Sequence, residues 1–424
     1  MIIVIIYSYL FWCNKSYEAN RLNPEINNTD IKWSRAVKND LKKGTKYQFD
    51  SSLIVDVLYR PFVKRKLYFS KQLNEMQYQL ASVFTVQDNC ENTVMSLTFH
   101  EQLQYPSIQV SKSLWDYGYG ARDSTGLPLY IYTKDGSRHD NITDWALKQF
   151  QAHYENPALV PTRGVGMPSH RAAVQDAARL QLHSHAARGN EINTARGNEI
   201  NQFQTHDEDS KLKPRFELQT EDSESKPWFV SLNKTDIFNY VYAVLHDPRY
   251  REKFALNLKA EFPRIPFHPD FAAWAAIGAK LIKLHAEFEH VEPWEFERVE
   301  SSVRPEPVEG LESFMLQGAS TKKTAKTKLK ADKIKHCIEI DSQTTLANIP
   351  PEAWQYQLGN RSALEWVLDQ YKEKTPKDPT IREKFNTYRF ADHKEHVIEL
   401  LAKVCRVSVE TMALIEEIQA LTWD

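Results

Sequence analysis

Short apolar and alternating runs predict a strand-rich unit in the first third of the chain. β-Branched and aromatic residues cluster at 53–59, 94–99, 107–110 and 129–132, and Gly, Pro, Asn or Asp bound each cluster. Such runs between turn residues are typical of β-strands. A helix is expected to follow from Asn141 onward, with Thr143 or Asp144 as its N-cap.

Helical patterning returns after residue 228. Residues 236–246 and 250–262 are predicted as helices that Asp247-Pro248 separates. Asp270 is expected to cap a long helix that ends near Glu289 and has an apolar stripe on one face. A strand at 337–340 and a turn at Pro350-Pro351 are expected to precede four further helices, at 362–371, 379–385, 394–406 and 408–421. Ser408 is the expected cap of the last, with Val409, Met412, Ile415 and Ile418 facing inward.

Two segments interrupt this patterning. Residues 155–226 contain the heptapeptide Ala-Arg-Gly-Asn-Glu-Ile-Asn twice and then a carboxylate-rich stretch, and 300–330 combine proline, glutamate and lysine. Segments with so few apolar residues cannot offset the entropy of ordering, so both are predicted to be disordered insertions. The expected fold is therefore α+β, in six segments: 1–29 (apolar), 30–154 (mixed sheet), 155–226 (insertion), 227–299 (helical scaffold), 300–330 (Lys-rich insertion) and 331–424 (small α+β unit).

The apolar run at 2–13 is too short to cross about 30 Å of hydrocarbon as a helix. No basic residue precedes it, and Asn14-Lys15 follow it, so a signal peptide is disfavoured. A buried strand, or a start codon inside an older frame, remains open. The cysteines form no C-x-x-C pair, which fits a reducing compartment. We expect a cytoplasmic protein with no membrane partner.

Catalytic motifs are missing from the sequence. It has no G-x-x-x-x-G-K-[ST] phosphate loop, no dinucleotide fingerprint and no G-x-S-x-G elbow. The histidine pairs 183/185, 285/290 and 393/396 do not follow the H-E-x-x-H pattern, so core or solvated histidines are favoured over metal ligands. We therefore expect no catalytic residue, metal or cofactor in this chain.

Charge is strongly segregated along a nearly neutral chain. The 54 basic and 56 acidic residues give a net charge of −2, yet residues 32–71 hold eleven basic residues against Asp40, Asp50 and Asp56. Interleaved aromatic residues suit nucleic acid, whose phosphates lysine and arginine neutralise. A solvated basic face with core aromatics is an equally good interpretation of charge alone. The candidate DNA contacts are Lys32, Arg35, Lys42, Lys43, Arg60, Lys64, Arg65 and Lys66.

Two weaker candidates lie further along the chain. The lysine cluster at 321–335 falls within the predicted insertion, where it would add at most loose backbone contacts. Arg361, between Asn360 and Ser362, would give a donor-rich turn at a helix start that suits a phosphate. Simple capping of that helix by Ser362 is favoured over this alternative.

Several separate motifs, in order, resemble one family. They include Leu58-Tyr59-Arg60-Pro61-Phe62, the run at 236–246, Pro263-Arg264-Ile265-Pro266, the run at 358–366 and Lys377-Asp378-Pro379. In this order they are similar to the C-terminal specificity region of type ISP restriction–modification enzymes, over about residues 30–150, 228–298 and 331–415. The resemblance implies sequence-specific recognition of double-stranded DNA by the 30–154 unit. In the full-length family it also implies S-adenosylmethionine, ATP and Mg, bound by regions that have no counterpart here.

The resemblance leaves three functions open. The chain is expected to be a specificity module without catalysis of its own, in which reversal of Arg60, Lys64, Arg65 and Lys66 to glutamate abolishes duplex binding. Alternatively, it is the C-terminal part of an adenine-N6 methyltransferase that acts with a separate methyltransferase or nuclease–helicase subunit. The third interpretation is a non-functional fragment of a decayed gene, because 304–310 resembles a translated dispersed repeat.

Overall fold

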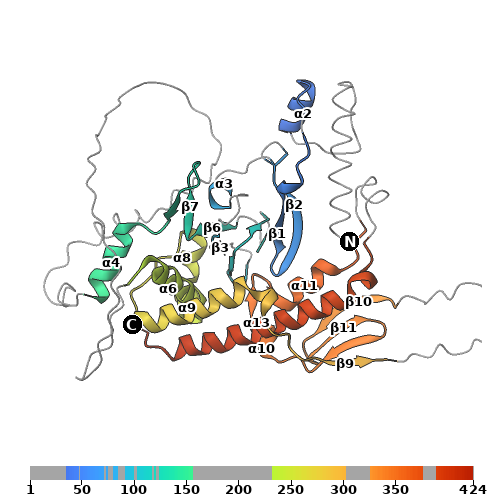
Figure 1. Ribbon diagram of the computed structural model, residues 1–424. Coiled ribbons are helices and arrows are strands. Elements are labelled where there is room, and N and C mark those ends of the chain that lie inside the picture. The colour runs from blue at the N-terminus through green and yellow to red at the C-terminus, as the bar shows by residue number, and fades with distance from the viewer. Residues whose placement is uncertain are drawn as a thin grey trace, which may run out of the picture. The chain divides into compact units, whose positions relative to one another are not determined.

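The computed structural model (Figure 1) describes residues 35–46, 48–70, 73–74, 80–84, 91–99, 103–116, 119–120, 124–155, 232–301, 325–375 and 388–423. Helices and several small sheets occur together, which confirms the α+β class. Segment 1–29, most of the two predicted insertions and the predicted helix at 379–385 lie outside the described residues.

Small sheets make up most of the described part before residue 155. One sheet has the order β2-β1-β5, with β1 antiparallel to β2 and parallel to β5. A second is antiparallel with the order β4-β3-β6, and β7 pairs with β8. Their bounds are β1 Ile54–Arg60, β2 Val63–Tyr68, β3 Val94–Thr98, β4 Ser107–Ser111, β5 Leu114–Trp115, β6 Thr125–Pro128, β7 Tyr130–Tyr132 and β8 Arg138–Asp140. The helical elements here are α2 Arg35–Lys42, η1 Ser51–Leu53, α3 Leu80–Val83 and α4 Asp144–Tyr154.

Side chains immediately before the helices explain where several of them begin. Thr143 Oγ1 accepts a hydrogen bond from Ala146 N (3.2 Å) and caps α4. Asp270 accepts from Ala273 N (3.3 Å) and caps α9, as predicted. The helix predicted from residue 236 begins two residues earlier, because Asn233 and Asp236 form a reciprocal capping box.

Three helices form the main apolar core: α6 (Lys234–His246), α9 (Phe271–Ala286) and α13 (Lys394–Ala420). Figure 1 shows α9 and α13 side by side. Trp274, Tyr240 and Leu281 are fully buried between these helices. The helices α6 and α9 cross closely at Gly278, where an added Cβ would lie only 1.9 Å from the carbonyl oxygen of Asn239.

A four-stranded antiparallel sheet of order β10-β11-β12-β9 belongs to the C-terminal part. One face of it is apolar, with Leu329, Ile338, Ile340 and Leu346 fully buried, and α11 packs against both β10 and α13. The bounds are β9 Glu297–Glu300, β10 Thr327–Asp332, β11 Cys337–Asp341 and β12 Thr344–Ala347. The remaining elements are α7 Pro248–Lys253, α8 Ala255–Ala260, η3 Phe288–His290, α10 Glu352–Gln355, β13 Gln357–Leu358, β14 Arg361–Ser362, α11 Ala363–Tyr371 and η4 Phe390–His393.

The prediction of two helices at 394–406 and 408–421 is wrong, because α13 is continuous. Ser408 does not cap a helix; it is buried in the middle of α13, and its hydroxyl donates to Val404 O (2.7 Å). The hydroxyl is thus satisfied without a break in the helix. The phase of the continuous helix leaves Val409 and Met412 only partly buried, whereas Ile415 and Ile418 face inward as predicted.

Two other boundaries also differ from the prediction. The helix expected over 250–262 is divided at Phe254 into α7 and α8 and ends at Ala260. The insertion expected over 300–330 extends too far, because β10 already begins at Thr327. Lysines alternate there with Leu329 and Ala331, which is the period of a strand with one buried face.

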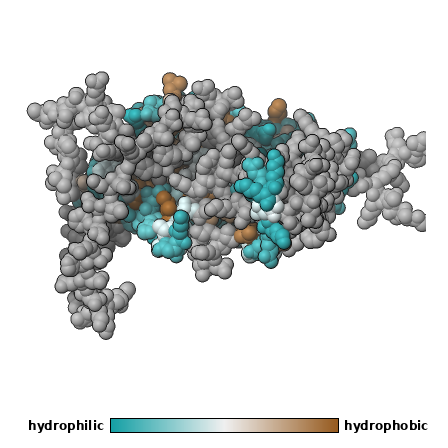
Figure 2. Space-filling view, turned by 90° about the horizontal axis from the view of Figure 1, so that it is seen from above, coloured by the Kyte–Doolittle hydropathy of each residue, from teal (hydrophilic) through white to brown (hydrophobic). Residues whose placement is uncertain are grey.

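Large apolar side chains are exposed at separate places on the described surface. In Figure 2 the hydrophobic residues among those coloured form only small, separate spots. Leu256 is 83% exposed and Ile334 is 91% exposed. Among the described residues, no helix is both long enough and apolar enough to cross a bilayer.

Candidate nucleic-acid interface

The β1–β2 hairpin holds four of the predicted contact residues and turns at Pro61-Phe62. Phe62 adopts a left-handed conformation (φ 61°), and its side chain is buried edge-on against Phe288 of η3, with ring centroids 5.2 Å apart. Phe62 of the Arg-Pro-Phe motif therefore packs the tip of the hairpin against η3, which follows α9.

The strand register separates the three consecutive cations of this hairpin. Lys64 lies opposite Leu58, Arg65 opposite Val57 and Lys66 opposite Asp56. Because side chains alternate along a strand, Lys64 and Lys66 lie on one face and Arg65 on the other. The basic run is therefore not a single patch.

Three cations of the hairpin have carboxylate partners. Arg60 Nη1 donates to Asp116 Oδ1 (2.6 Å), and Lys66 Nζ pairs with Asp56 Oδ2 (2.7 Å). Lys64 pairs with Glu289 of η3. Arg65 differs, because its guanidinium lies 5.1 Å from the centre of the Tyr371 ring and donates to the carbonyl of Lys64. Of the four, Arg65 is the cation whose charge no described carboxylate neutralises.

The end of α2 presents further cations. Lys42 is in the last turn of this helix, and Lys43 follows it; both are exposed. Neither forms an ion pair with a residue in the described ranges. Arg35 is the first residue of α2, and Lys32 lies outside the described residues. Within the described residues, no carboxylate thus neutralises Lys42 or Lys43.

Arg361 contacts two side chains of α11, Asp369 and Trp366. Its Nη1 donates to Asp369 Oδ2 (3.1 Å), and its guanidinium lies 5.0 Å from the Trp366 ring. Lys372 and Lys374 also reach Asp369, at 4.0 and 3.4 Å. Burial opposes ionisation of Asp369, but the charge of Arg361 and Lys374 lowers its pKa below the usual value. Three cations therefore share one carboxylate, and the cluster stays positive.

The start of α11 is a capping box. Glu365 N donates to Ser362 Oγ (3.4 Å), and Ser362 N donates to Glu365 Oε2 (2.8 Å). Asn360 Oδ1 accepts from Gln104 N (2.7 Å). The donor-rich turn is thus occupied within the protein, which confirms the capping interpretation. Arg361 and Arg65 both lie against α11, although 296 positions separate them in the sequence.

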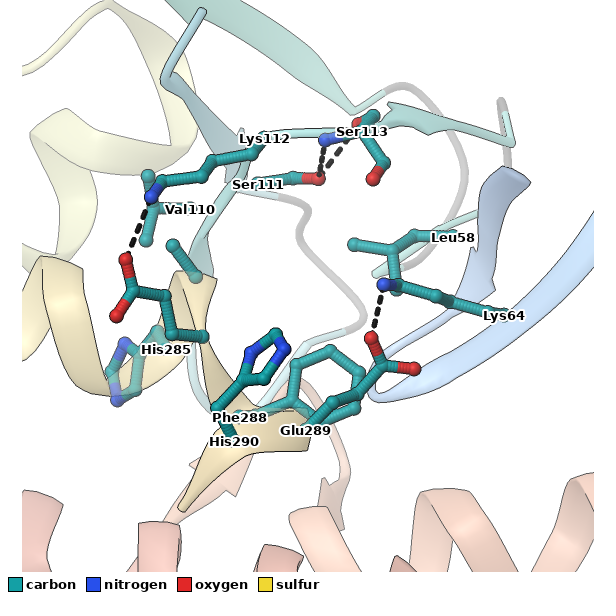
Figure 3. A pocket seen from close by; sticks show the side chains of 12 residues that line it. Leu58, Lys64, Val110, Ser111, Lys112, Ser113, His285, Phe288, Glu289 and His290 are labelled. Atoms are coloured by element: carbon teal, nitrogen blue, oxygen red, sulfur yellow. Dashed lines mark hydrogen bonds and ion pairs between the residues drawn. The ribbon is translucent and has the colours of Figure 1, made fainter. Parts of the chain in front are cut away.

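A cavity of about 230 Å³ lies where the small sheets meet the end of α9 (Figure 3). Two ion pairs border it: Lys64 with Glu289, and Lys112 Nζ with Glu287 Oε1 (2.7 Å). The hydrogen bond from Lys112 lowers the pKa of Glu287. Each lysine of the lining is matched by a glutamate, so the cavity favours neither an anion nor a cation.

His285, which lines this cavity, belongs to a buried hydrogen-bond chain that joins α6, α9 and α13. Thr411 Oγ1 donates to Val407 O (2.6 Å) and lies 2.8 Å from His285 Nε2. Because the Thr411 hydroxyl proton is donated to Val407 O, the Thr411 oxygen must accept from His285, and Nε2 of His285 carries the proton. The other ring nitrogen, Nδ1, then accepts from the Tyr242 hydroxyl (2.6 Å). Burial, helped by the charge of Arg251, lowers the pKa of His285 to about 3. This histidine is a neutral core residue.

The other histidine pairs give no metal site within the described ranges. No group of three or more His, Cys, Asp or Glu side chains is placed there to hold an ion. His183 and His185 lie outside the described residues.

Sequence reasoning missed the partners of the predicted cations. Asp116 lies 56 positions from Arg60, and Glu289 lies 225 positions from Lys64. No local pattern marks such carboxylates, because only the packing of the sheets against η3 and α9 brings them near.

Comparisons with solved structures show which proteins this chain resembles in fold. A DrdV–DNA complex, solved by cryo-electron microscopy, is 36% identical over 99% of this chain and 34% of that chain, with a TM-score of 0.72. A nuclease-deletion mutant of the Type ISP restriction–modification enzyme LlaGI, in complex with a DNA substrate mimic, is 23% identical over 97% of this chain and 30% of that chain (TM-score 0.62). The ATP-dependent Type ISP enzyme LlaBIII bound to DNA is 18% identical over 97% and 21% (TM-score 0.64). The last two are similar in fold alone.

The chain spans about a third of the length of the DrdV chain. None of the curated proteins matches it. Residues 9–400 match the model of the Type ISP C-terminal specificity domain. That match covers most of the sequence, and the chain therefore belongs to the Type ISP C-terminal specificity domain family.

Proposed function

We propose that the chain recognises a specific sequence in double-stranded DNA, as the target-recognition part of a Type ISP restriction–modification system. The family match over residues 9–400 is the observation that carries this proposal. The solved relative that is 36% identical is a DNA complex, which agrees with it.

Within this proposal the unneutralised cations are the DNA contacts. Lys42 and Lys43 lie exposed at the end of α2, and Arg65 has an aromatic partner in place of a carboxylate. Arg361 adds to the positive cluster around Asp369. Lys32 and Arg35, which precede or begin α2, belong to the same proposal. Arg60, Lys64 and Lys66 are also proposed contacts. Each has a partly exposed carboxylate partner, which it would have to leave in order to reach DNA.

Selection of bound duplexes from a random DNA pool, at two salt concentrations, tests the function. An enriched motif that persists at the higher salt concentration is expected, because base-edge contacts carry sequence information and phosphate contacts do not. Binding without enrichment, which disappears as salt rises, would leave only phosphate attraction and would refute the proposal.

Charge reversal tests the contact residues. We expect Lys42→Glu/Lys43→Glu to weaken binding to the selected duplex about tenfold and to lower the salt slope by about 2. Lys259→Glu/Lys283→Glu is the matched control, because both lysines are exposed on helices (α8 and α9) outside this surface. Equal losses in the two variants would mean that α2 only adds general charge.

We further propose that methylation and cleavage depend on regions or subunits that this chain lacks. The DrdV chain is about three times as long, which supports this. The purified chain is expected to bind S-adenosylmethionine only after a methyltransferase subunit is added, as calorimetry can measure. Tight binding by the chain alone would contradict this part of the proposal.

A further inference from the structure

The β10–β11 hairpin ends in an apolar side chain that the fold leaves uncovered. Its turn runs from Lys333 to His336, and Ile334 in this turn is 91% exposed. By contrast, Leu329 and Ile338 on the same two strands are fully buried. Folding gains nothing from an isoleucine at this position, since its side chain stays in water.

The tip is held in one conformation by contacts on three sides. Asp332 Oδ1 accepts from Ile334 N (3.2 Å) and from Lys335 N (3.0 Å). Lys333 Nζ pairs with Glu365 of α11 (3.0 Å), and His336 O accepts from Ile349 N. Ile334 is therefore presented on a fixed support, so little ordering entropy would be lost when a partner covers it.

Lysines line the strand that leads to this tip. Lys326, Lys328 and Lys330 point to solvent, while Leu329 between them is buried. Lys328 is paired with Glu339 (2.9 Å). Lys326 and Lys330 form no ion pair with any residue that the structure describes. A row of lysines thus runs along β10 toward Ile334, in which Lys330 lies opposite Glu339.

Protection of the sheet edge explains only part of this arrangement. The strand β10 is an edge strand, and lysines on an edge discourage pairing with another chain. Lys333 and Lys335 already place charge at the tip, so edge protection gives no reason for the exposed isoleucine between them. Duplex DNA matches both the lysines and the isoleucine. Its phosphates border a groove and would attract the lysines, and apolar side chains can insert between the bases of that groove.

We propose that the β10–β11 hairpin is a second DNA-contacting element, in which Lys326 and Lys330 bind backbone phosphates and Ile334 enters a groove of the duplex. A two-stranded ribbon fits the major groove, and an isoleucine can also wedge into the minor groove; both use the same residues. This inference rests on the proposed function, because it requires that the chain bind duplex DNA.

The test compares three variants of the full chain on the duplex selected above. Lys326→Glu/Lys330→Glu keeps charge on the edge strand, so edge protection is retained while phosphate attraction is lost. We expect about tenfold weaker binding and a salt slope lower by about 2. Ile334→Ala should weaken binding about tenfold with an unchanged salt slope. Lys259→Glu/Lys283→Glu is the control and should lower neither the affinity nor the salt slope as strongly.

The outcomes separate this inference from the proposed function. If the wild-type chain selects no motif, the proposed function fails and the inference fails with it. If it selects a motif and both hairpin variants bind like wild type, the inference alone is refuted. A change from dimer to monomer in Ile334→Ala, with DNA affinity unchanged, would make the tip a contact between two copies and would also refute it.

Discussion

Arg60 combines a fixed position with a charge that DNA could use. Its guanidinium is held by Asp116 Oδ1 (2.6 Å) and lies 4.1 Å from the centre of the Tyr59 ring. The pair is partly exposed, so it contributes only about 1 kcal/mol or less to folding. An arginine in this state can be released to a guanine edge or a phosphate at little cost.

A charge swap separates the two roles of Arg60. Arg60→Asp alone should lower the free energy of unfolding by about 1 kcal/mol, because it places two carboxylates together. Arg60→Asp/Asp116→Arg should restore most of that loss, as urea denaturation can measure. If Arg60 contacts DNA, the double variant still binds the selected duplex about tenfold more weakly than wild type. Wild-type affinity in the stable double variant would make Arg60 a purely structural residue.

His285 gives the fold a dependence on pH. Burial lowers its pKa to about 3 in the folded chain, whereas an unfolded histidine has a pKa of about 6.5. Between these values the unfolded state binds more protons, so stability is complete above about pH 6.5 and falls as the pH drops toward 3. The slope for one such group is about 1.4 kcal/mol per pH unit.

Replacement of this histidine tests the linkage. Between pH 7 and pH 5, wild type should lose about 2 kcal/mol more stability than His285→Asn, measured by urea denaturation at both pH values. His246, whose pKa burial also lowers well below its usual value, is present in both proteins and cancels in the comparison. An equal loss in the two proteins would mean that His285 can be protonated in the folded chain.

At the scale of elements, the crossing of α6 and α9 is set by one glycine. An added Cβ at Gly278 would lie 1.9 Å from the carbonyl oxygen and 2.6 Å from the carbonyl carbon of Asn239. Those atoms are helix backbone and cannot rotate away, so the helices would have to separate. The loss of packing outweighs the higher helix propensity of alanine.

We expect Gly278→Ala to lower the free energy of unfolding by about 1–3 kcal/mol, measured by urea denaturation. Ala279→Gly, at the next and exposed position of α9, is the control and should cost up to about 1 kcal/mol through propensity alone. If Gly278→Ala were more stable than wild type, the two helices could not lie as close as described.

Local signals in the sequence predict where elements begin, whereas distant packing decides how they continue. The caps Thr143, Asp270 and Ser362 act within three residues of themselves, so each can be identified from a short window. Ser408 has the same local signal as a cap, but the packing of α13 against α9 and α11 keeps the helix continuous through it.

The same contrast applies to the candidate interface. The basic composition of 32–71 is visible in the sequence, but the partition of its charges is not. Arg65 and Lys64 are neighbours in the chain; the strand places them on opposite faces, one on Tyr371 and the other on Glu289. For these two residues, whether a described carboxylate neutralises the cation therefore depends on residues more than two hundred positions away.

At the scale of the whole molecule, the described residues up to Glu155 and those from Asn233 onward belong to one compact unit. Contacts across the segment between them hold its flanks together. Lys234 Nζ at the start of α6 lies 2.7 Å from Asp144 Oδ1 at the start of α4, and the Tyr154 hydroxyl donates to His268 O (2.8 Å). These contacts join the chain directly on either side of the segment that the sequence predicts to be an insertion.

We therefore expect that replacing residues 158–231 by about ten Gly and Ser residues preserves both folding and DNA selectivity. Such a linker has a root-mean-square length of about 17 Å, close to the length of α4, which separates Asp144 from the segment. Closing a loop several times shorter should stabilise the fold slightly, by about 1–2 kcal/mol. Urea denaturation and the random-pool selection would measure the two properties. A shortened chain that folds normally but selects a different motif, or none, would show that the segment takes part in recognition.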